Sequence, residues 1–333
     1  MPRNIPDIDQ LTELWEPRLR DAFLESIDGV TDRVTLKQIT ALLERGDIDG
    51  LLDYLRINRL SFQGFEIAMR DMYEAGGMRF GSSLPTLAQF VFDVRNPQAE
   101  AWIRDRSSNL VTEIVQDQRN MIRGHLVEGL ARGDNPRTTA IELVGRIDRA
   151  TGKRSGGIIG LTQQQEAWQR AYAAELVSDD PAMLRKALGR KLRDKRFDRA
   201  IQKAIRTGKP IPAETRRKMA RSYRNRMLKY RADVIARTET LQSLAGSQYE
   251  TYRQAIDAGE LRADQVTKIW KSASDERVRF SHAILHNDKA LFDQPFISPL
   301  GNAMRFPGDR SLGVTAADTI QCRCTLNYRV VFE

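Results

Sequence analysis

The sequence contains few of the residues on which disulfide frameworks and nucleotide-binding loops depend. Its 333 residues include two cysteines and three histidines. Two cysteines cannot build a disulfide framework, and their scarcity is typical of proteins that fold in a reducing cytosol. The stretch GGIIG follows helix-like sequence and matches neither the phosphate-binding loop nor the dinucleotide-binding pattern. The sequence therefore indicates neither a disulfide-stapled fold nor a nucleotide-binding enzyme.

Long apolar runs are also absent. No stretch approaches the roughly 20 apolar residues of a membrane helix. The start, MPRNIPDIDQLTELWEPRL, mixes charges and lacks the apolar core of a signal peptide. We therefore expect no membrane segment and no secretory signal. Hydrophobic residues make up 41% and charged residues 29% of the chain, which is ordinary for a soluble globular protein.

The chain is mostly helical in pattern up to about residue 260. Apolar residues recur at helical spacing, Thr35 is expected to cap one helix that ends at Gly46, and Gly133 is expected to end a long one. Near the C-terminus, QVTKIWKSA and CRCTLNYRVVF resemble strands instead. We predict a mainly α fold with elongated helical N-terminal and middle regions and a small α+β C-terminal domain. The predicted ranges are a helical region at 1–105, a helical core at 106–260 with a Gly-rich linker or hairpin at 149–162, and the α+β domain at 261–333.

One segment carries the positive charge of the chain. Residues 185–231 contain 19 Lys and Arg and three acidic residues, a net charge of +16, so the rest carries −7 of the total of +9. This density favours non-specific contact with DNA phosphates, which weakens with salt. A solvated face or an interface with an acidic protein would have the same charge. Three aromatic residues in the segment are too few for a base-stacking platform. The predicted DNA-binding residues are Arg190, Lys191, Arg193, Lys195, Arg196, Arg199, Arg216, Arg217, Lys218, Arg221, Arg224 and Arg226.

A predicted helix in SDERVRFSHAILH would carry a polar stripe. Ser272 and Asp275 have the spacing of a capping box, so the helix is expected to start just after Ser272. From there Asp275, Arg279, His282 and His286 recur at spacings of four, three and four, which places them on one face. We predict an ion pair between Asp275 and Arg279, and a structural polar cluster of Asp275, Arg279 and His282.

The two cysteines lie close together at the beginning of the last predicted strand. On one face of a strand, the side chains of Cys322 and Cys324 would be about 6.6 Å apart, too far for a disulfide or for a shared zinc ion. Metal binding therefore requires the strand to bend or to begin after Cys322. Three interpretations stay open: a structural core cluster, a structural zinc site and a catalytic centre. The candidate zinc ligands are His282, Cys322 and Cys324, with His286 as a further candidate.

Several stretches resemble one protein family. VIARTETLQSLAGSQYETYRQA, KIWKSASDERVRFSHAILH and DTIQCRC, with VEGLARGDNPRTTAIELVGRI and GGIIGLTQQQ upstream, are similar to the phage head morphogenesis family, the Mu F-like minor head proteins. The resemblance covers residues 125–330. In this family the motif R-x-x-H-x-x-L is usually followed by an acidic or amide residue and Gly. Here the motif ends at Leu285 and is followed by HND, which begins with His286. His286 is therefore not an expected family position. His282, Cys322 and Cys324 remain the better-supported ligands.

The resemblance implies a structural protein of the virion. We expect a low-copy component in the capsid interior or at the portal vertex, assembled in the bacterial host cytoplasm. Its expected partners are the portal and coat proteins and double-stranded DNA, which it would contact without sequence preference during head assembly, genome packaging and delivery. We expect no catalysis and no cofactor other than a structural zinc ion. The alternatives are a metal-dependent hydrolase or nuclease, and an adaptor that binds only portal or coat protein.

Some relatives carry a fused toxin or ADP-ribosyltransferase domain after this region. Nine residues follow Cys324. We therefore expect no such domain here.

Overall fold

The computed structural model describes residues 8–84, 90–148 and 151–332. Within these ranges the protein is mainly helical, with small antiparallel sheets near the C-terminus, which confirms the predicted fold class. No helix in the described ranges is both long enough and apolar enough to span a bilayer.

The chain forms two compact units. Unit 1 contains Met1–Ala22, Gly64–Asn109 and Asp233–Glu333, and unit 2 contains Phe23–Gln63 and Leu110–Ala232. The division differs from the predicted ranges 1–105, 106–260 and 261–333, because three long helices contribute residues to both units. These helices are α1 (Ile8–Asp32), α5 (Pro97–Ala131) and α10 (Ala213–Asp257).

The helices of unit 2 begin where the sequence supplies caps. Before α2 (Leu36–Glu44), the Thr35 side chain accepts a hydrogen bond from Gln38 N, and Gly46 follows with a φ of 67°, as predicted. Proline at the first helical position and an Asn or Asp cap start α6 (Pro136–Val144) and α8 (Pro181–Gly189). The other elements are α3 (Ile48–Leu55), η1 (Arg59–Phe62), β1 (Arg146–Ile147), β2 (Arg154–Ser155), α7 (Gln163–Val177), η2 (Lys195–Phe197) and α9 (Asp198–Thr207).

The Gly-rich range 149–162 contributes to the core of unit 2. Its first two residues lie outside the described part of the chain, and β2 pairs antiparallel with β1. After β2 the chain turns inward, so that Ile158 and Leu161 are fully buried. Gln118 of α5 accepts a hydrogen bond from Gly160 N and donates one to Leu161 O. These bonds satisfy backbone groups that burial removes from water.

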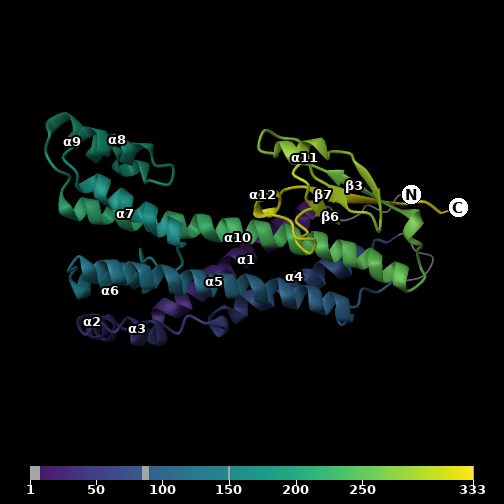
Figure 1. Cartoon of the computed structure of the whole chain (residues 1–333), viewed down its shortest axis with the longest axis horizontal. Helices are drawn as coiled ribbons and strands as arrows, with labels where there is room; N and C mark the ends of the chain where they lie inside the picture. The colour runs from purple at the N-terminus through teal and green to yellow at the C-terminus, as the bar shows by residue number, and fades with distance from the viewer. Residues whose placement is uncertain (1–7, 85–89, 149–150, 333) are drawn as a thin grey trace. The chain divides into compact units, whose positions relative to one another are not determined.

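In unit 1 the C-terminal part of α10 lies between helices and a sheet (Figure 1). One side contacts α4 (Gln63–Gly81) and α5, and the other contacts an antiparallel sheet with the strand order β4-β3-β7. Aromatic rings join the sheet to α10: Tyr252 and Tyr328 stack with centroids 4.2 Å apart. The C-terminal module, residues 261–332, comprises η3 (Ala263–Gln265), β3 (Val266–Lys271), α11 (Phe280–Ile284), β4 (Lys289–Leu291), β5 (Phe296–Ile297), β6 (Ala303–Met304), α12 (Ala316–Thr319) and β7 (Thr325–Val330).

Glycines allow α10 to approach its helical neighbours closely. A Cβ atom on Gly246 would lie 2.8 Å from the ring of Trp102 in α5, and one on Gly76 of α4 would lie 2.5 Å from the hydroxyl of Ser247. Trp102 also stacks on Tyr73, with ring centroids 5.1 Å apart. The aromatic core of unit 1 therefore depends on the missing side chain at position 246.

Replacing Gly246 with Ala should lower the free energy of unfolding by about 1–3 kcal/mol, because the added methyl group overpacks against Trp102. This loss should exceed the gain of up to about 1 kcal/mol in helix propensity. Gly124→Ala in α5 is the matched control, since no atom lies within 4 Å of its Cβ position, and it should be neutral or stabilising. Urea denaturation measures both changes. A stabilising effect at both positions would contradict the close packing at Gly246.

Candidate metal centre and candidate nucleic-acid interface

The ARTET stretch of α10 anchors the C-terminal module. Thr238 Oγ1 accepts a hydrogen bond from the backbone N–H of Gln321, which immediately precedes Cys322. The next residue, Glu239, pairs with Arg106 of α5 at 2.7 Å. Adjacent residues of one helix thus bind the cysteine-bearing segment and a second helix of unit 1.

The segment between β3 and α11 is not helical. α11 covers only Phe280–Ile284, so the predicted helix start just after Ser272 is wrong. Ser274 has a φ of 53°, in the left-handed region, which ends any helix there. The carboxylate of Asp275 accepts two hydrogen bonds from Arg323, at 2.5 and 2.6 Å. This contact across 48 positions outweighs the local capping box.

The four residues of the predicted stripe therefore lie in different surroundings. The hydrogen-bonded pair with Arg323 lowers the pKa of the exposed Asp275 to about 2. Arg279 donates instead to the backbone oxygen of Ile320, and Nδ1 of His286 lies 2.9 Å from a serine hydroxyl. Only His282 is buried, with 1% of its surface exposed. No ion pair or hydrogen bond in the described ranges joins Asp275, Arg279 and His282, so the predicted ion pair is not formed.

The structure does bring His282, Cys322 and Cys324 together. Nδ1 of His282 lies 3.4 Å from each sulfur, and the three candidate ligand atoms lie within 4.8 Å of one another. Both cysteines are free and 4% exposed. β7 begins at Thr325, after both of them, so strand geometry does not hold the thiols apart. His286 is not part of this group.

A buried carboxylate lies on the other side of the imidazole. Asp318 of α12 places Oδ1 3.4 Å from Nε2 of His282. Burial would raise the pKa of Asp318, but hydrogen bonds from Ser298, Asn302 and Ser281 outweigh it and lower the pKa. Asp318 belongs to the DTIQCRC stretch, but sequence spacing alone does not predict its contact with His282.

The two thiols are electrostatically different. A hydrogen bond between them raises the pKa of Cys322 and lowers that of Cys324. Burial raises the pKa of Cys322 further and opposes the change at Cys324, where the indole of Trp270 also lowers the pKa. Cys324 therefore loses its proton more readily than Cys322, and the thiolate is the form that binds metals.

Several of the predicted DNA-binding arginines form ion pairs with acidic residues of unit 2. Asp194, which is 2% exposed, binds Arg196 at 2.7 Å and Arg226 at 3.3 Å, and the hydrogen bond from Arg196 lowers its pKa. Arg224 is buried, with 8% of its surface exposed. The members with an ion pair to an acidic residue are Arg190, Arg193, Arg196, Arg217 and Arg226.

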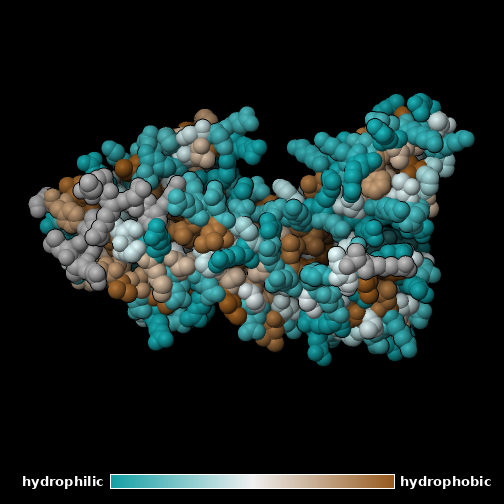
Figure 2. All heavy atoms as spheres, turned by 180° about the vertical axis from the view of Figure 1, so that it is seen from behind, coloured by the Kyte–Doolittle hydropathy of each residue, from teal (hydrophilic) through white to brown (hydrophobic). Residues whose placement is uncertain are grey.

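Other members of the set face solvent. Lys191, Lys195, Arg199 and Lys218 are exposed and make no ion pair with the described residues. Figure 2 shows mainly hydrophilic residues over α8 and α9, which contribute to this part of unit 2. These four residues are the members best placed to meet a polyanion.

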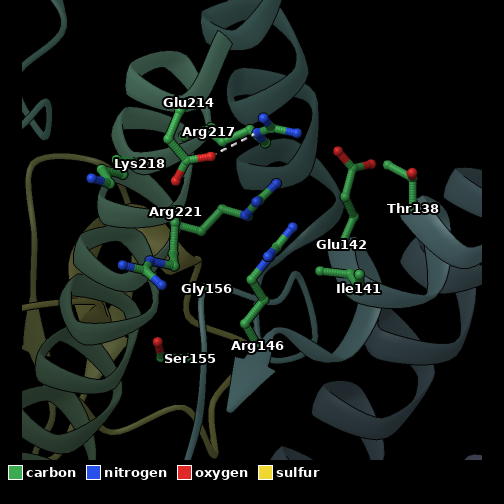
Figure 3. Close-up of a pocket in the computed structure, with 12 residues that line it drawn as sticks. Thr138, Ile141, Glu142, Arg146, Ser155, Gly156, Glu214, Arg217, Lys218 and Arg221 are labelled. Carbon is green, nitrogen blue, oxygen red and sulfur yellow. Dashed lines mark ion pairs between the residues drawn. The ribbon is translucent and has the colours of Figure 1, made fainter. Parts of the chain in front are cut away.

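An open pocket of about 190 Å³ lies beside the first turns of α10 (Figure 3). Its cations include Arg217, Lys218 and Arg221 of α10 and Arg146 of β1, which Figure 3 shows reaching from the strand into the pocket. Arg224 also lines it, and its Nε has no hydrogen-bond partner in the described ranges. Arg146 is not among the predicted DNA-binding residues, because it lies outside the basic segment and reaches the pocket from the β1–β2 hairpin.

The fold and the sites thus define a mainly helical protein that has a cationic surface and a small α+β module. Residues 195–327 match the family model described as Phage Mu protein F like protein. This confirms the resemblance to the Mu F-like family over that part of the chain. No curated protein and no solved structure matches the chain.

Proposed function

We propose that this protein is a low-copy minor head protein that contacts packaged DNA without sequence preference and works beside the portal and coat proteins. It would assist head assembly, genome packaging and delivery from the capsid interior or the portal vertex. Two observations on unit 2 carry the DNA contact: the exposed cations that make no ion pair with described residues, and the cation-lined pocket, to which Lys218 contributes. Inside a head the phosphate concentration is high, so modest affinity that depends on charge suffices.

The proposed DNA contact depends on cationic side chains that can bind phosphate oxygens, and on no feature that recognises particular bases. Four exposed cations, together with Arg146, Arg217 and Arg221 at the pocket, present donors that phosphate oxygens accept. Neither a zinc finger nor a base-stacking platform accompanies them in the sequence. Binding should therefore follow the salt dependence of phosphate contacts, with a slope of about 0.9 in log–log form for each contact.

Neutralising Lys191, Arg199 and Lys218 together, each to Gln, should weaken binding to a generic 30-base-pair duplex. The slope of log affinity against log salt should fall by up to about 2.7, because each lost phosphate contact removes about 0.9. Fluorescence anisotropy between 50 and 300 mM salt measures both quantities (a range over which phosphate contacts lose roughly 10³-fold or more in affinity).

The matched control is Lys37→Gln, Arg45→Gln and Arg137→Gln, a triple variant with the same loss of charge at exposed positions of α2, its C-terminus and α6. The control should keep the wild-type slope. If the two triple variants weaken binding equally, only net charge matters. If the wild-type chain does not bind the duplex, the surface serves a protein partner, and co-purification with portal or coat protein becomes the measurement of choice.

We propose further that the protein is not an enzyme. His282, Cys322 and Cys324 are buried and lie on short segments that the rest of unit 1 holds in place. A hydrolytic or nuclease reaction would need these groups to meet a substrate. Incubation of the duplex with the full chain and added zinc should therefore leave the DNA intact, and cleavage that His282→Ala abolishes would contradict the proposal.

A further inference from the structure

The His282–Cys322–Cys324 cluster has the dimensions of a metal site. A tetrahedral zinc ion, bonded at about 2.3 Å to sulfur and about 2.05 Å to nitrogen, holds those atoms about 3.6 Å apart. Nδ1 of His282 lies 3.4 Å from both sulfurs. One ion could thus bond to all three atoms with little movement. Two thiolates and an imidazole form a ligand set suited to zinc rather than to calcium or magnesium.

The surroundings of the imidazole match a metal ligand. A metal-binding histidine almost always donates its other ring N–H to a carboxylate, a carbonyl or water. Nε2 of His282 is buried without a hydrogen bond to any described residue, and it lies 3.4 Å from Asp318 Oδ1. The Asp318 carboxylate is itself held by hydroxyls at 3.0 and 2.6 Å and by an amide at 2.7 Å. A proton on Nε2 would face this fixed carboxylate, which leaves the lone pair of Nδ1 directed at the sulfurs.

The backbone is shaped to bring the cysteines together. Gln321 has a φ of 54°, which is unfavourable for a residue with a side chain. Its N–H is held by Thr238 of α10, and the N–H of Cys324 points at the sulfur of Cys322 at 3.5 Å. Strained residues held by their neighbours are concentrated at functional sites. This turn replaces the separation of about 6.6 Å that a strand would impose on the two side chains.

We propose that one Zn²⁺ ion binds to Nδ1 of His282 and to the thiolates of Cys322 and Cys324, with Asp318 as a positioning residue and a water molecule as the fourth ligand. Binding releases the thiol protons. The ion joins α11 to the segment before β7 and thereby stabilises the C-terminal module. This site is independent of the DNA contact proposed for unit 2.

The first test is the metal content of the full chain, purified under reducing conditions and reconstituted with zinc. We expect about one zinc per chain after removal of loosely bound metal, since a tight site approaches full occupancy. Chelation should lower the melting temperature, and added zinc should restore it. Co²⁺ in place of zinc should give the visible absorption of a tetrahedral, thiolate-bound ion.

Variants assign the site to its residues. Cys322→Ser with Cys324→Ser, and separately His282→Gln, should lose the bound zinc and the cobalt spectrum. Asp318→Asn should keep the spectrum but weaken zinc binding about 10–100-fold, as expected for a positioning residue. His286→Gln is the matched control from the same module and should bind like the wild type, because His286 contacts a serine.

Two results would overturn the zinc site. One is a reconstituted wild-type chain that is folded by circular dichroism but holds less than about 0.1 zinc (a tight site should be nearly full). The other is equal zinc content in the wild type and in the double cysteine variant. Because the first result comes from the unaltered protein, misfolding of a variant cannot obscure the answer.

Discussion

Replacing Glu239 with Ala should lower the free energy of unfolding by about 3–5 kcal/mol, because the change leaves the charge of Arg106 inside unit 1 without its partner. Arg106 donates to both oxygens of Glu239, at 2.8 and 2.7 Å. Their side chains are 13% and 4% exposed, so water cannot replace the lost carboxylate. Urea denaturation followed by circular dichroism measures the loss as a lower transition midpoint.

Two further variants separate the buried pair from charge removal in general. Asp105→Ala breaks an exposed ion pair, in which the side chains of Asp105 and Arg104 are 65% and 62% exposed. This change should lower the free energy of unfolding by less than about 1 kcal/mol. The combined change Arg106→Met and Glu239→Leu removes both charges and should recover most of the stability. A Glu239→Ala protein that is as stable as Asp105→Ala would show that the pair does not hold α5 to α10.

Features encoded by neighbouring residues were predictable from the sequence. The cap at Thr35 and the closing Gly46 act within a few residues, and the structure has both where they were predicted. The helical fold class and the small α+β module also follow from patterns of short period. The alternating burial predicted for Cys322, Cys324, Leu326 and Tyr328 is also present. Only Leu326 and Tyr328 lie within β7, and the two cysteines precede it.

Features set by distant residues were not predictable. Asp275 has the local spacing of a cap, but its partner Arg323 lies 48 positions away. Asp318 faces His282, and Arg146 lines a pocket of α10, for the same reason: the fold brings them there. Charge counting had a similar limit, because it cannot distinguish an exposed cation such as Lys191 from one that an internal carboxylate neutralises.

Lys268 is a charged residue at a buried position of a strand in which buried and half-buried residues alternate. It lies on the buried face of β3, between Val266 and Trp270, and its surface is fully buried. Its ammonium group donates to the backbone oxygens of Gln294 and Arg305, at 2.7 and 3.0 Å. Burial lowers its pKa to about 8, and the nearby cation of Arg305 lowers it too. The charge at this position therefore opposes folding at neutral pH.

We expect the free energy of unfolding to depend on pH through Lys268. In the unfolded chain a lysine has a pKa of about 10.4, so between pH 8 and that value the unfolded state binds more protons than the folded state. Stability contributed by this residue should therefore rise with pH across that window, by up to about 3 kcal/mol, and be constant below pH 8, where both states are protonated.

The measurement is urea denaturation of the wild type and of Lys268→Met from pH 7 to pH 10.5 (a range that brackets the folded and unfolded pKa values, roughly 8 and 10.4). Because other groups titrate in this range, the difference between the two profiles isolates Lys268. The free energy of unfolding of the wild type should increase relative to that of Lys268→Met as the pH rises. Lys271→Met, which removes an exposed ammonium group of the same strand that donates to Asn287 at 2.6 Å, is the matched control for the loss of one lysine. A constant difference between wild type and Lys268→Met would mean that the two backbone oxygens stabilise the ammonium group enough to offset its burial.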